Sequence, residues 1–390
     1  MHTDLMTGKK RIIIFGFLVI VLLAVLLIII QKIKIKKPPI KIGFANTLTG
    51  SASTQVKIQR DVAVFIIDQV NNKGGINGRK IELIIKDDKF DPEEALRVDK
   101  ELINEGVVAI LGHTFSSLCL KVAPLINKHD ILMISPSAKS VELSRMNSNF
   151  LRLALPLDKD SEAVAKIAVN YLNLKKIAIV YDLINRDLTE PTAYYFKKEV
   201  ERLGGNITAN IPINSKEKIK IKDIAKKIID SNVDGVFIIS DAIHSALICQ
   251  HIRMNNSNIK IIMHGWPFSD PTFIREGGKA VEGVFGITFE NKSIASEKYL
   301  NFEKNFMKRY NENTSGPARF TFEAMEILLK ALTISDNPKK LKDIILKQKE
   351  FDGIYGKISF DKFGNPTRPM YIAEIRNGKR EIVGTFKETN

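Results

Sequence analysis

From residue 40 onward the chain alternates short apolar runs with longer amphipathic stretches, and this alternation constrains its fold more than any other feature. The short runs have the length of buried strands, whereas a stretch such as 55–72 repeats its apolar residues with the period of a helix. Strands are predicted at 41–45, 81–86, 107–111, 131–134, 177–181, 207–211, 235–240 and 259–263. Helices are predicted at 55–72, 118–128, 161–172, 193–203, 219–230 and 242–253. Strands that alternate with helices predict an α/β fold, in which helices cover both faces of a parallel sheet.

Residues that begin and end helices support this pattern. Asp91-Pro92-Glu93-Glu94 predicts a helix start, because proline suits the first turn and acids suit the positive end of the helix dipole. Gly204-Gly205 predicts a helix end. The alternation restarts after Asp158, so the chain is expected to hold two α/β units in sequence.

The length of 390 residues also favours two domains plus a tail over one core. The C-terminal part has a different pattern from the two α/β units. It predicts two long helices followed by a hairpin and its turn, at 297–310, 320–332, 355–361 and 362–365.

Residues 12–30 form an uncharged run of 19 residues. A helix of that length spans roughly 28 Å, about the thickness of the hydrocarbon core of a membrane. Lysines flank the run on both sides, and no Ala-x-Ala site for a signal peptidase follows it. We therefore predict an N-terminal transmembrane helix that acts as an uncleaved signal anchor, although a cleaved signal peptide stays possible. Residues 1–39 would be anchor and linker, and the rest would lie outside the cytoplasm, in the periplasm or at the cell surface.

The charge of the chain argues against a nucleic-acid partner. Residues 1–41 hold eight Lys and Arg residues and one acid, so they carry +7 of the total of +15 and surround the apolar run. The remaining residues show no basic stripe with interleaved aromatic residues.

The sequence predicts neither catalysis nor a metal or other cofactor. It contains no Gly-x-Ser-x-Gly, Walker or Gly-x-Gly-x-x-Gly motif and no metal-ligand motif among its histidines. Cys119 and Cys249 are too few for a disulfide framework or a metal site, and the sequence leaves open whether they are free.

One segment, Asn71–Leu83, is more specific than the rest. It reads Asn-Asn-Lys-Gly-Gly-Ile-Asn-Gly-Arg-Lys-Ile-Glu-Leu, and Asp87-Asp88 and Asp91-Pro92 follow it. Local chemistry alone explains it as a helix end and a tight turn into a strand. However, this order of residues resembles the leucine/isoleucine/valine-binding proteins of ABC importers. Further segments fit the same family, and the resemblance extends from about residue 40 to about residue 385. These segments are Leu48–Gly50, Leu111–Ser117, Ile131–Ser137 and Lys176–Asp182.

The resemblance implies a type I periplasmic-binding-protein fold, with two Rossmann-like lobes joined by three hinge crossings. We expect the crossings near Leu157, Phe289 and Gly356. Lobe 1 would then comprise 40–157 plus 290–356, and lobe 2 would comprise 158–289 plus 357–390. In such a fold a small ligand binds between the lobes, and the protein delivers it to an ABC permease.

The family's ligand-binding positions map onto named residues of lobe 1. The serine after the third strand maps to Ser116, the small residue after the fourth strand maps to Ser137, and the family's threonine is replaced by Lys139. Ser116 would lie at a helix N-terminus, where amide groups favour an anion. The alternative is that Ser116 only caps that helix.

Lobe 2 departs further from the family. Arg186 and Asp241 stand where the family has aromatic residues, and Trp266 stands where it has the acid that receives the ligand's ammonium group. An aromatic residue of lobe 1 is replaced by Gln55. Asp241 would either replace the missing acid or pair with Lys139 or Arg186 across the site. Because cations replace an acid, the expected ligand is a small carboxylate, which need not be a branched-chain amino acid.

Two functions fit this interpretation. One is a solute-binding protein of an ABC importer. The other is a ligand-sensing domain that signals occupancy to a membrane partner. A signalling chain is expected to continue into a cytoplasmic output domain, whereas only Met1–Lys10 precede the predicted anchor, which favours transport.

Overall fold

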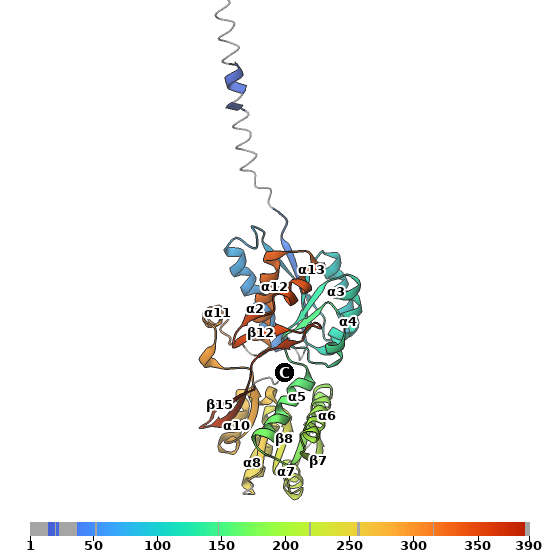
Figure 1. The fold of residues 1–390 in the computed structure, drawn as a ribbon, viewed down its shortest axis with the longest axis vertical. Coiled ribbons are helices and arrows are strands. Elements are labelled where there is room, and N and C mark those ends of the chain that lie inside the picture. Colours follow the sequence, from blue (N-terminus) through green and yellow to red (C-terminus); the bar gives the residue numbers. More distant parts are fainter. Residues whose placement is uncertain are drawn as a thin grey trace, which may run out of the picture.

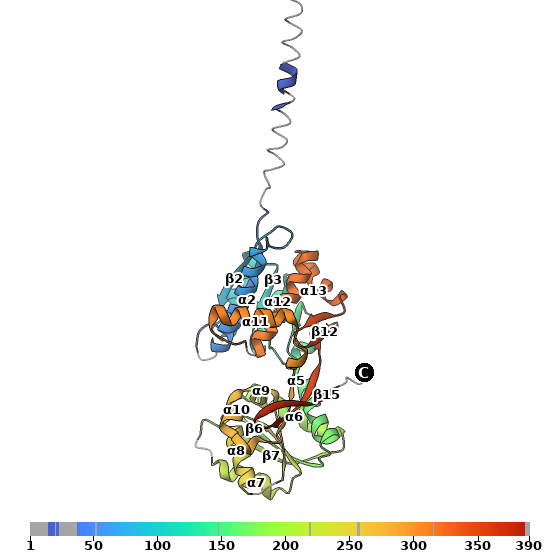
Figure 2. The same cartoon turned by 90° about the vertical axis from the view of Figure 1, so that its left-hand side faces the viewer.

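The computed structural model describes residues 15–19, 21–22, 37–50, 53–146, 148–217, 220–255, 258–314 and 316–386. Figures 1 and 2 show two lobes that follow one another along the long axis of the molecule. Most of the apolar run at 12–30 lies outside the described residues. Within the part that is described, no helix combines the length and the apolar character needed to cross a membrane.

The described part of the first lobe is built on a five-stranded parallel sheet in the order β2-β1-β3-β4-β5. Its strands are β1 (Ile40–Asn46), β2 (Ile81–Asp87), β3 (Ala109–Gly112), β4 (Leu132–Ser135) and β5 (Phe150–Arg152). The connecting helices are α2 (Ser53–Asn72), α3 (Pro92–Asn104), α4 (Ser116–Lys128) and the short 3-10 helix η1 (Glu142–Arg145). As predicted, Asp91 caps α3, and its carboxylate accepts the N–H of Glu94 at 2.8 Å.

Helices cover both faces of this sheet, which explains why its strands are apolar at successive positions. Phe44 and Leu111 pack on the face covered by α2, whereas Ile110 and Met133 pack on the face covered by α3 and α4. The first face is completed by helices from much later in the chain: α11 (Glu297–Tyr310), α12 (Gly316–Ile334) and α13 (Pro338–Lys347).

The described part of the second lobe is built on a seven-stranded sheet in the order β15-β14-β10-β9-β8-β6-β7. Five of its strands are parallel: β6 (Lys176–Asp182), β7 (Asn206–Ile213), β8 (Gly235–Ile239), β9 (Lys260–Met263) and β10 (Phe285–Thr288). The antiparallel strands β14 (Met370–Arg376) and β15 (Lys379–Phe386) extend the β10 edge.

The helices of the second lobe pack against both faces of this sheet. The α-helices are α5 (Leu157–Lys166), α6 (Arg186–Arg202), α7 (Ile221–Asp230), α8 (Ala242–Met254), α9 (Gly265–Ser269) and α10 (Pro271–Gly277). Shorter elements of this lobe are the π-helical turn η2 (Ile167–Tyr171) and the 3-10 helices η3 (Leu183–Asn185) and η4 (Gly278–Val281). The 3-10 helix η5 (Lys292–Ile294) follows the return to the first lobe, since Ala295 packs against the core of that lobe. Cys119 and Cys249 are buried in the two lobes as free thiols.

A small antiparallel sheet lies in the chain just before its last crossing to the second lobe. Its strands are β11 (Phe351–Gly353), β12 (Gly356–Phe360) and β13 (Pro366–Thr367). Phe351 and Ile358 belong to the core of the first lobe, whereas β14 pairs with β10 of the second. The chain therefore passes between the lobes three times: first between β5 and α5, then between β10 and α11, and last between β13 and β14. The sequence analysis placed this last passage near Gly356, before a hairpin that folds with the first lobe.

Arg368 lies in this third passage and contacts the other two. Its guanidinium donates to the carbonyl oxygen of Leu153 in the first passage at 3.3 Å, and its Cζ lies 5.5 Å from the ring centre of Phe289 in the second. It also lies over the ring of Phe320. Its two terminal nitrogens form a bidentate ion pair with the carboxylate of Glu323 on α12, at 2.9 and 3.0 Å. Arg368 and Glu323 are both buried. One side chain thus connects the three segments that join the lobes.

Candidate ligand-binding site

The carboxyl ends of the parallel strands in the two lobes lie toward each other. The first sheet ends in β5, and the chain continues directly into α5, which packs in the core of the second lobe. The second sheet reaches β10, and the chain then returns to α11 of the first lobe. Open α/β sheets bind ligands beyond the carboxyl ends of their strands. The loops at these two edges are therefore the candidate site.

The structure brings Ser116, Ser137 and Lys139 together in the first lobe. The Ser116 hydroxyl oxygen accepts the backbone N–H groups of Lys139 and Ser140 at 2.9 and 3.0 Å. The Ser137 hydroxyl donates to the carbonyl oxygen of Thr114 at 3.2 Å. These bonds hold the loop after β4 against the start of α4.

Ser116 is the first residue of α4 and not its cap. The cap position is Phe115, whose side chain makes no capping hydrogen bond. Among the described residues the Ser116 hydroxyl accepts two hydrogen bonds and donates none. Its proton is therefore available to an acceptor placed beside the N-terminus of the helix, where the dipole favours negative charge.

Lys139 reaches from the first lobe to the second. Its ammonium pairs with the carboxylate of Asp160 on α5, and its carbonyl oxygen accepts the N–H of Leu157 at 3.0 Å. Burial raises the pKa of Asp160 against the opposing effect of Lys139. The other oxygen of Asp160, Oδ1, is buried without a hydrogen-bond partner. The cation predicted at position 139 is thus already paired with an acid in this structure.

The three predicted residues of the second lobe make local contacts. Arg186 begins α6 and pairs with Glu190 one turn later, at 2.8 Å. Asp241 caps α8, and its Oδ2 lies 2.6 Å from Nδ1 of His244. Trp266 lies in α9 with 43 % of its surface exposed. The alternative in which Asp241 pairs with Lys139 or Arg186 is not what the structure shows.

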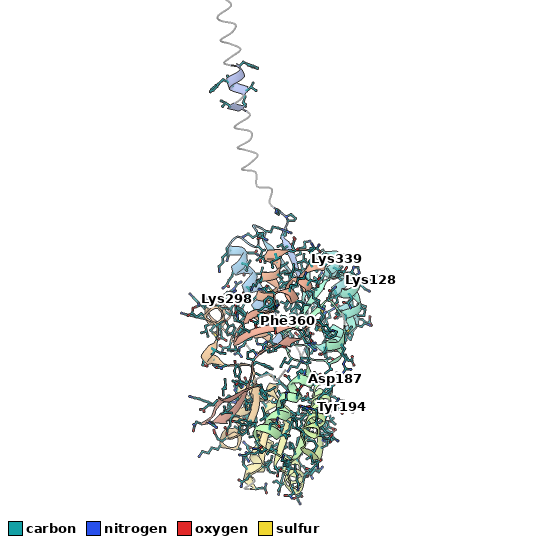
Figure 3. The ribbon with its side chains drawn as sticks, viewed as in Figure 1. Lys128, Asp187, Tyr194, Lys298, Lys339 and Phe360 are labelled. Atoms are coloured by element: carbon teal, nitrogen blue, oxygen red, sulfur yellow. The ribbon has the colours of Figure 1, made fainter. Side chains whose placement is uncertain are left out.

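A hollow of about 550 Å³ lies along α6 in the second lobe. Its lining residues are Arg186, Asp187, Glu190, Pro191, Tyr194 and Tyr195. In Figure 3, Asp187 lies at the end of the second lobe that is nearer to the first, and Tyr194 lies further along the same helix. The hollow therefore borders the region between the lobes on the side of Arg186.

A buried charge cluster supports the loop that leads into α4. His113 follows β3 directly, and its Nδ1 and Nε2 lie 2.6 and 3.4 Å from the carboxylates of Asp88 and Asp99. Burial lowers the pKa of His113, but the two carboxylates outweigh it and raise that pKa to about 9. The carbonyl oxygen of His113 accepts from the Ser135 hydroxyl at 2.6 Å. This cluster fixes the backbone just ahead of Thr114 and Ser116, and the sequence analysis did not identify it.

Among the residues that the structure describes, no group of three or more His, Cys, Asp or Glu side chains is arranged to hold a metal ion.

The fold and the paired strand edges define a two-lobed α/β binding protein. The model of the family described as periplasmic binding protein matches residues 39–380, and this chain belongs to that family.

One relative and two solved structures illustrate the similarity. The leucine-, isoleucine-, valine-, threonine- and alanine-binding protein of Pseudomonas aeruginosa is 32% identical over 181 residues, which cover 46% of this chain and about half (48%) of that protein. The branched-chain amino acid transporter substrate binding protein of Streptococcus pneumoniae, solved with isoleucine, is 23% identical with a TM-score of 0.73, and the match covers 89% of this chain and 99% of that one. A solute binding protein of an ABC transporter from Rhodopseudomonas palustris, solved with 3,4-dihydroxy benzoic acid, is 20% identical with a TM-score of 0.72, over 89% and 97% of the chains. These proteins bind solutes and are not enzymes, in agreement with the prediction that this chain catalyses no reaction.

Proposed function

We propose that this chain is the solute-binding protein of an ABC importer and that it binds an amino acid or a related small carboxylate between its lobes. The observation that carries the proposal is the placement of Ser116. The Ser116 hydroxyl donates no hydrogen bond among the described residues. It lies at the N-terminus of α4, at the edge of the first sheet that faces the second lobe.

The chemistry of this position favours a carboxylate. The N–H groups in the first turn of α4 and the Ser116 hydroxyl are donors, and the helix dipole favours an anion there. Isoleucine and 3,4-dihydroxy benzoic acid, found in the two similar structures, both carry a carboxyl group. A carboxylate is therefore the common chemical group that the proposal assigns to the first lobe.

The remaining predicted residues complete the proposed site. Ser137 and Lys139 would line it in the first lobe, and Arg186, Asp241 and Trp266 would line it in the second. Since Lys139 already pairs with Asp160, an incoming carboxylate would compete with Asp160 for this cation. Closure of the lobes around the ligand would use the three passages between them as hinges.

The proposal extends to the location of the protein. Residues 12–30 would anchor it in the membrane, which is supported by the length of the uncharged run and by its lysine flanks. The two lobes would then lie outside the cytoplasm and deliver the solute to a permease. Resistance of the full chain to carbonate extraction from membranes would support the anchor, and release into the soluble fraction would contradict it.

The binding experiment uses Trp266, the only tryptophan of the chain. The full chain in detergent would be titrated with amino acids, keto acids, aromatic carboxylates and their amides while Trp266 emission and melting temperature are followed. A bound ligand at about a hundredfold over its Kd stabilises the folded state by roughly 2.7 kcal/mol.

Two variants separate the proposed site from a nonspecific effect. Ser116→Ala should weaken carboxylate binding by roughly tenfold, because it removes one donor to a charged group. Ser117→Ala removes the neighbouring exposed hydroxyl and should leave the affinity unchanged. Equal affinities for both variants, or no saturable response to any carboxylate, would overturn the proposal.

A further inference from the structure

A buried histidine at the strand edge of the second lobe has an unused hydrogen-bond donor. His264 follows β9 directly and is only 1% exposed. Its Nδ1 accepts the backbone N–H of Trp266 at 3.3 Å, so this nitrogen carries no proton. The proton of the neutral ring must then lie on Nε2, which has no partner among the described residues.

The ring stays neutral at physiological pH. Burial, and after it the charge of Lys139, lower the pKa of His264 to about 3. Nε2 is therefore a donor without a positive charge. Because His264 follows β9, it stands at the carboxyl end of a parallel strand, on the edge of the second sheet where the candidate site lies.

A second unused atom lies on the same lobe. Asp160 Oδ1 is a buried acceptor without a partner, while its other oxygen pairs with Lys139. Buried donors and acceptors that stay unpaired are costly and rare in folded proteins. One donor and one acceptor are the complement of a carbonyl oxygen and an N–H group, and an aliphatic side chain satisfies neither.

We propose that His264 is a ligand-binding residue whose Nε2–H donates to an oxygen atom of the ligand, at the end opposite to the carboxylate held by Ser116. This inference rests on the proposed function and specifies its ligand class. The ligand is a small carboxylate that also carries a carbonyl oxygen, and a primary carboxamide is chosen because it offers an acceptor for His264 Nε2–H and a donor of the kind that Asp160 Oδ1 lacks. The proposed second lobe thus selects a ligand oxygen, whereas the names of other relatives, the Leu/Ile/Val-binding proteins, indicate ligands with aliphatic side chains.

Isosteric ligand pairs test the selection directly. Asparagine and leucine are similar in size and shape, but asparagine carries a carboxamide where leucine carries an isopropyl group. Succinamate and 4-methylpentanoate form the same pair without the amino group. Calorimetry on the full chain in detergent should show that at least one carboxamide binds roughly tenfold or more tightly than its aliphatic partner, because only the carboxamide pairs the buried donor.

Variants assign the preference to His264. His264→Leu should remove the preference between the members of a pair, whereas His264→Gln should keep part of it because the glutamine amide also donates. His129→Leu is the control, because His129 is exposed and lies at the opposite end of α4 from Ser116.

Two further measurements on the wild-type chain do not depend on a variant that folds. The affinity for the carboxamide should show no titration step at the ordinary pKa of histidine, about 6.5; the other titratable group of the proposed contact is Asp160, whose pKa burial raises, and its neighbouring cation is Lys139. Nitrogen NMR of the histidine-labelled chain should show that carboxamide binding shifts the Nε2 signal of a neutral ring protonated on Nε2.

The outcomes separate the two proposals. If none of the four compounds binds, this inference is overturned, whereas the proposed function is overturned only if the wider panel of carboxylates also gives no saturable response. If leucine or 4-methylpentanoate binds as tightly as its carboxamide partner, or His264→Leu preserves the carboxamide preference, this inference alone is overturned.

Discussion

Replacing Arg368 by methionine should destabilise the protein strongly, because Arg368 is buried and connects the three passages between the lobes. Methionine keeps the bulk of the side chain but leaves the Glu323 carboxylate, whose exposed fraction is 1%, without its cation. Removing one partner of a buried ion pair costs about 3–5 kcal/mol. The lost contacts with Phe289 and Phe320 add roughly 0.5–2 kcal/mol. The sum is a large share of the roughly 5–15 kcal/mol that a folded domain has.

Urea unfolding of the full chain, followed by far-UV circular dichroism and by Trp266 emission, measures this cost. Trp266 reports on the second lobe, whereas circular dichroism reports on both. Loss of the connection between the passages should therefore separate the two unfolding curves in Arg368→Met. The paired variant Glu323→Gln/Arg368→Met should recover much of the stability, since no buried charge is left unpaired.

Arg376→Met is the matched control. Arg376 pairs with Glu374 on β14, but its side chain is 51% exposed, so its loss should cost about 1 kcal/mol or less. The reasoning is refuted if Arg368→Met costs no more than this control. It is also refuted if the paired variant is as unstable as the sum of its single substitutions.

Three other substitutions test features of the first lobe. The pKa of His113 is raised from 6.5 to about 9, so its protonation stabilises the fold fully below pH 6.5 and this stabilisation is lost as the pH rises through 9. The free energy of unfolding in urea should therefore change with pH by about 3 kcal/mol more in the wild type than in His113→Gln. Gly112→Ala should prevent stable folding, because Gly112 has a φ of 142° and a Cβ would lie 2.0 Å from the carbonyl oxygen of Ala45; a melting temperature equal to that of the wild type would contradict this. Lys139→Ala should weaken carboxylate binding roughly tenfold, because it removes a charged donor, and an unchanged calorimetric affinity would show that Lys139 serves only Asp160.

The sequence predicts those parts of the fold that depend on local pattern. Strands such as β1 and β6 are apolar runs buried on both faces, and α3 begins at the predicted Asp91-Pro92. The antiparallel strands β14 and β15 were not predicted. Most residues of β15 are at least partly exposed, so it lacks the apolar run that marks the central strands. An exposed edge strand leaves a weaker signal than a central one.

The sequence was enough to predict where the candidate site lies, but not which of its side chains pair with one another. Family resemblance placed Ser116, Ser137 and Lys139 together, because adjacent parallel strands bring their following loops to one edge. The pairing of Lys139 with Asp160 depends on how the two lobes meet, and no sequence pattern marks the unpaired nitrogen of His264. Glu323 and Arg368 are likewise 45 residues apart, and no periodic pattern connects them.

The interleaved course of the chain has a consequence for biogenesis. The core of the first lobe is shared between strands that end at residue 152 and helices that begin with α11 at residue 297, so synthesis of the 144 residues between them separates its two halves. The second sheet likewise receives β14 and β15 only after the first lobe's last strand. Contacts between such distant segments form slowly, because loop closure precedes the gain from packing. The first lobe of a nascent chain with this topology therefore cannot complete its core until helices α11 and α12 have been made.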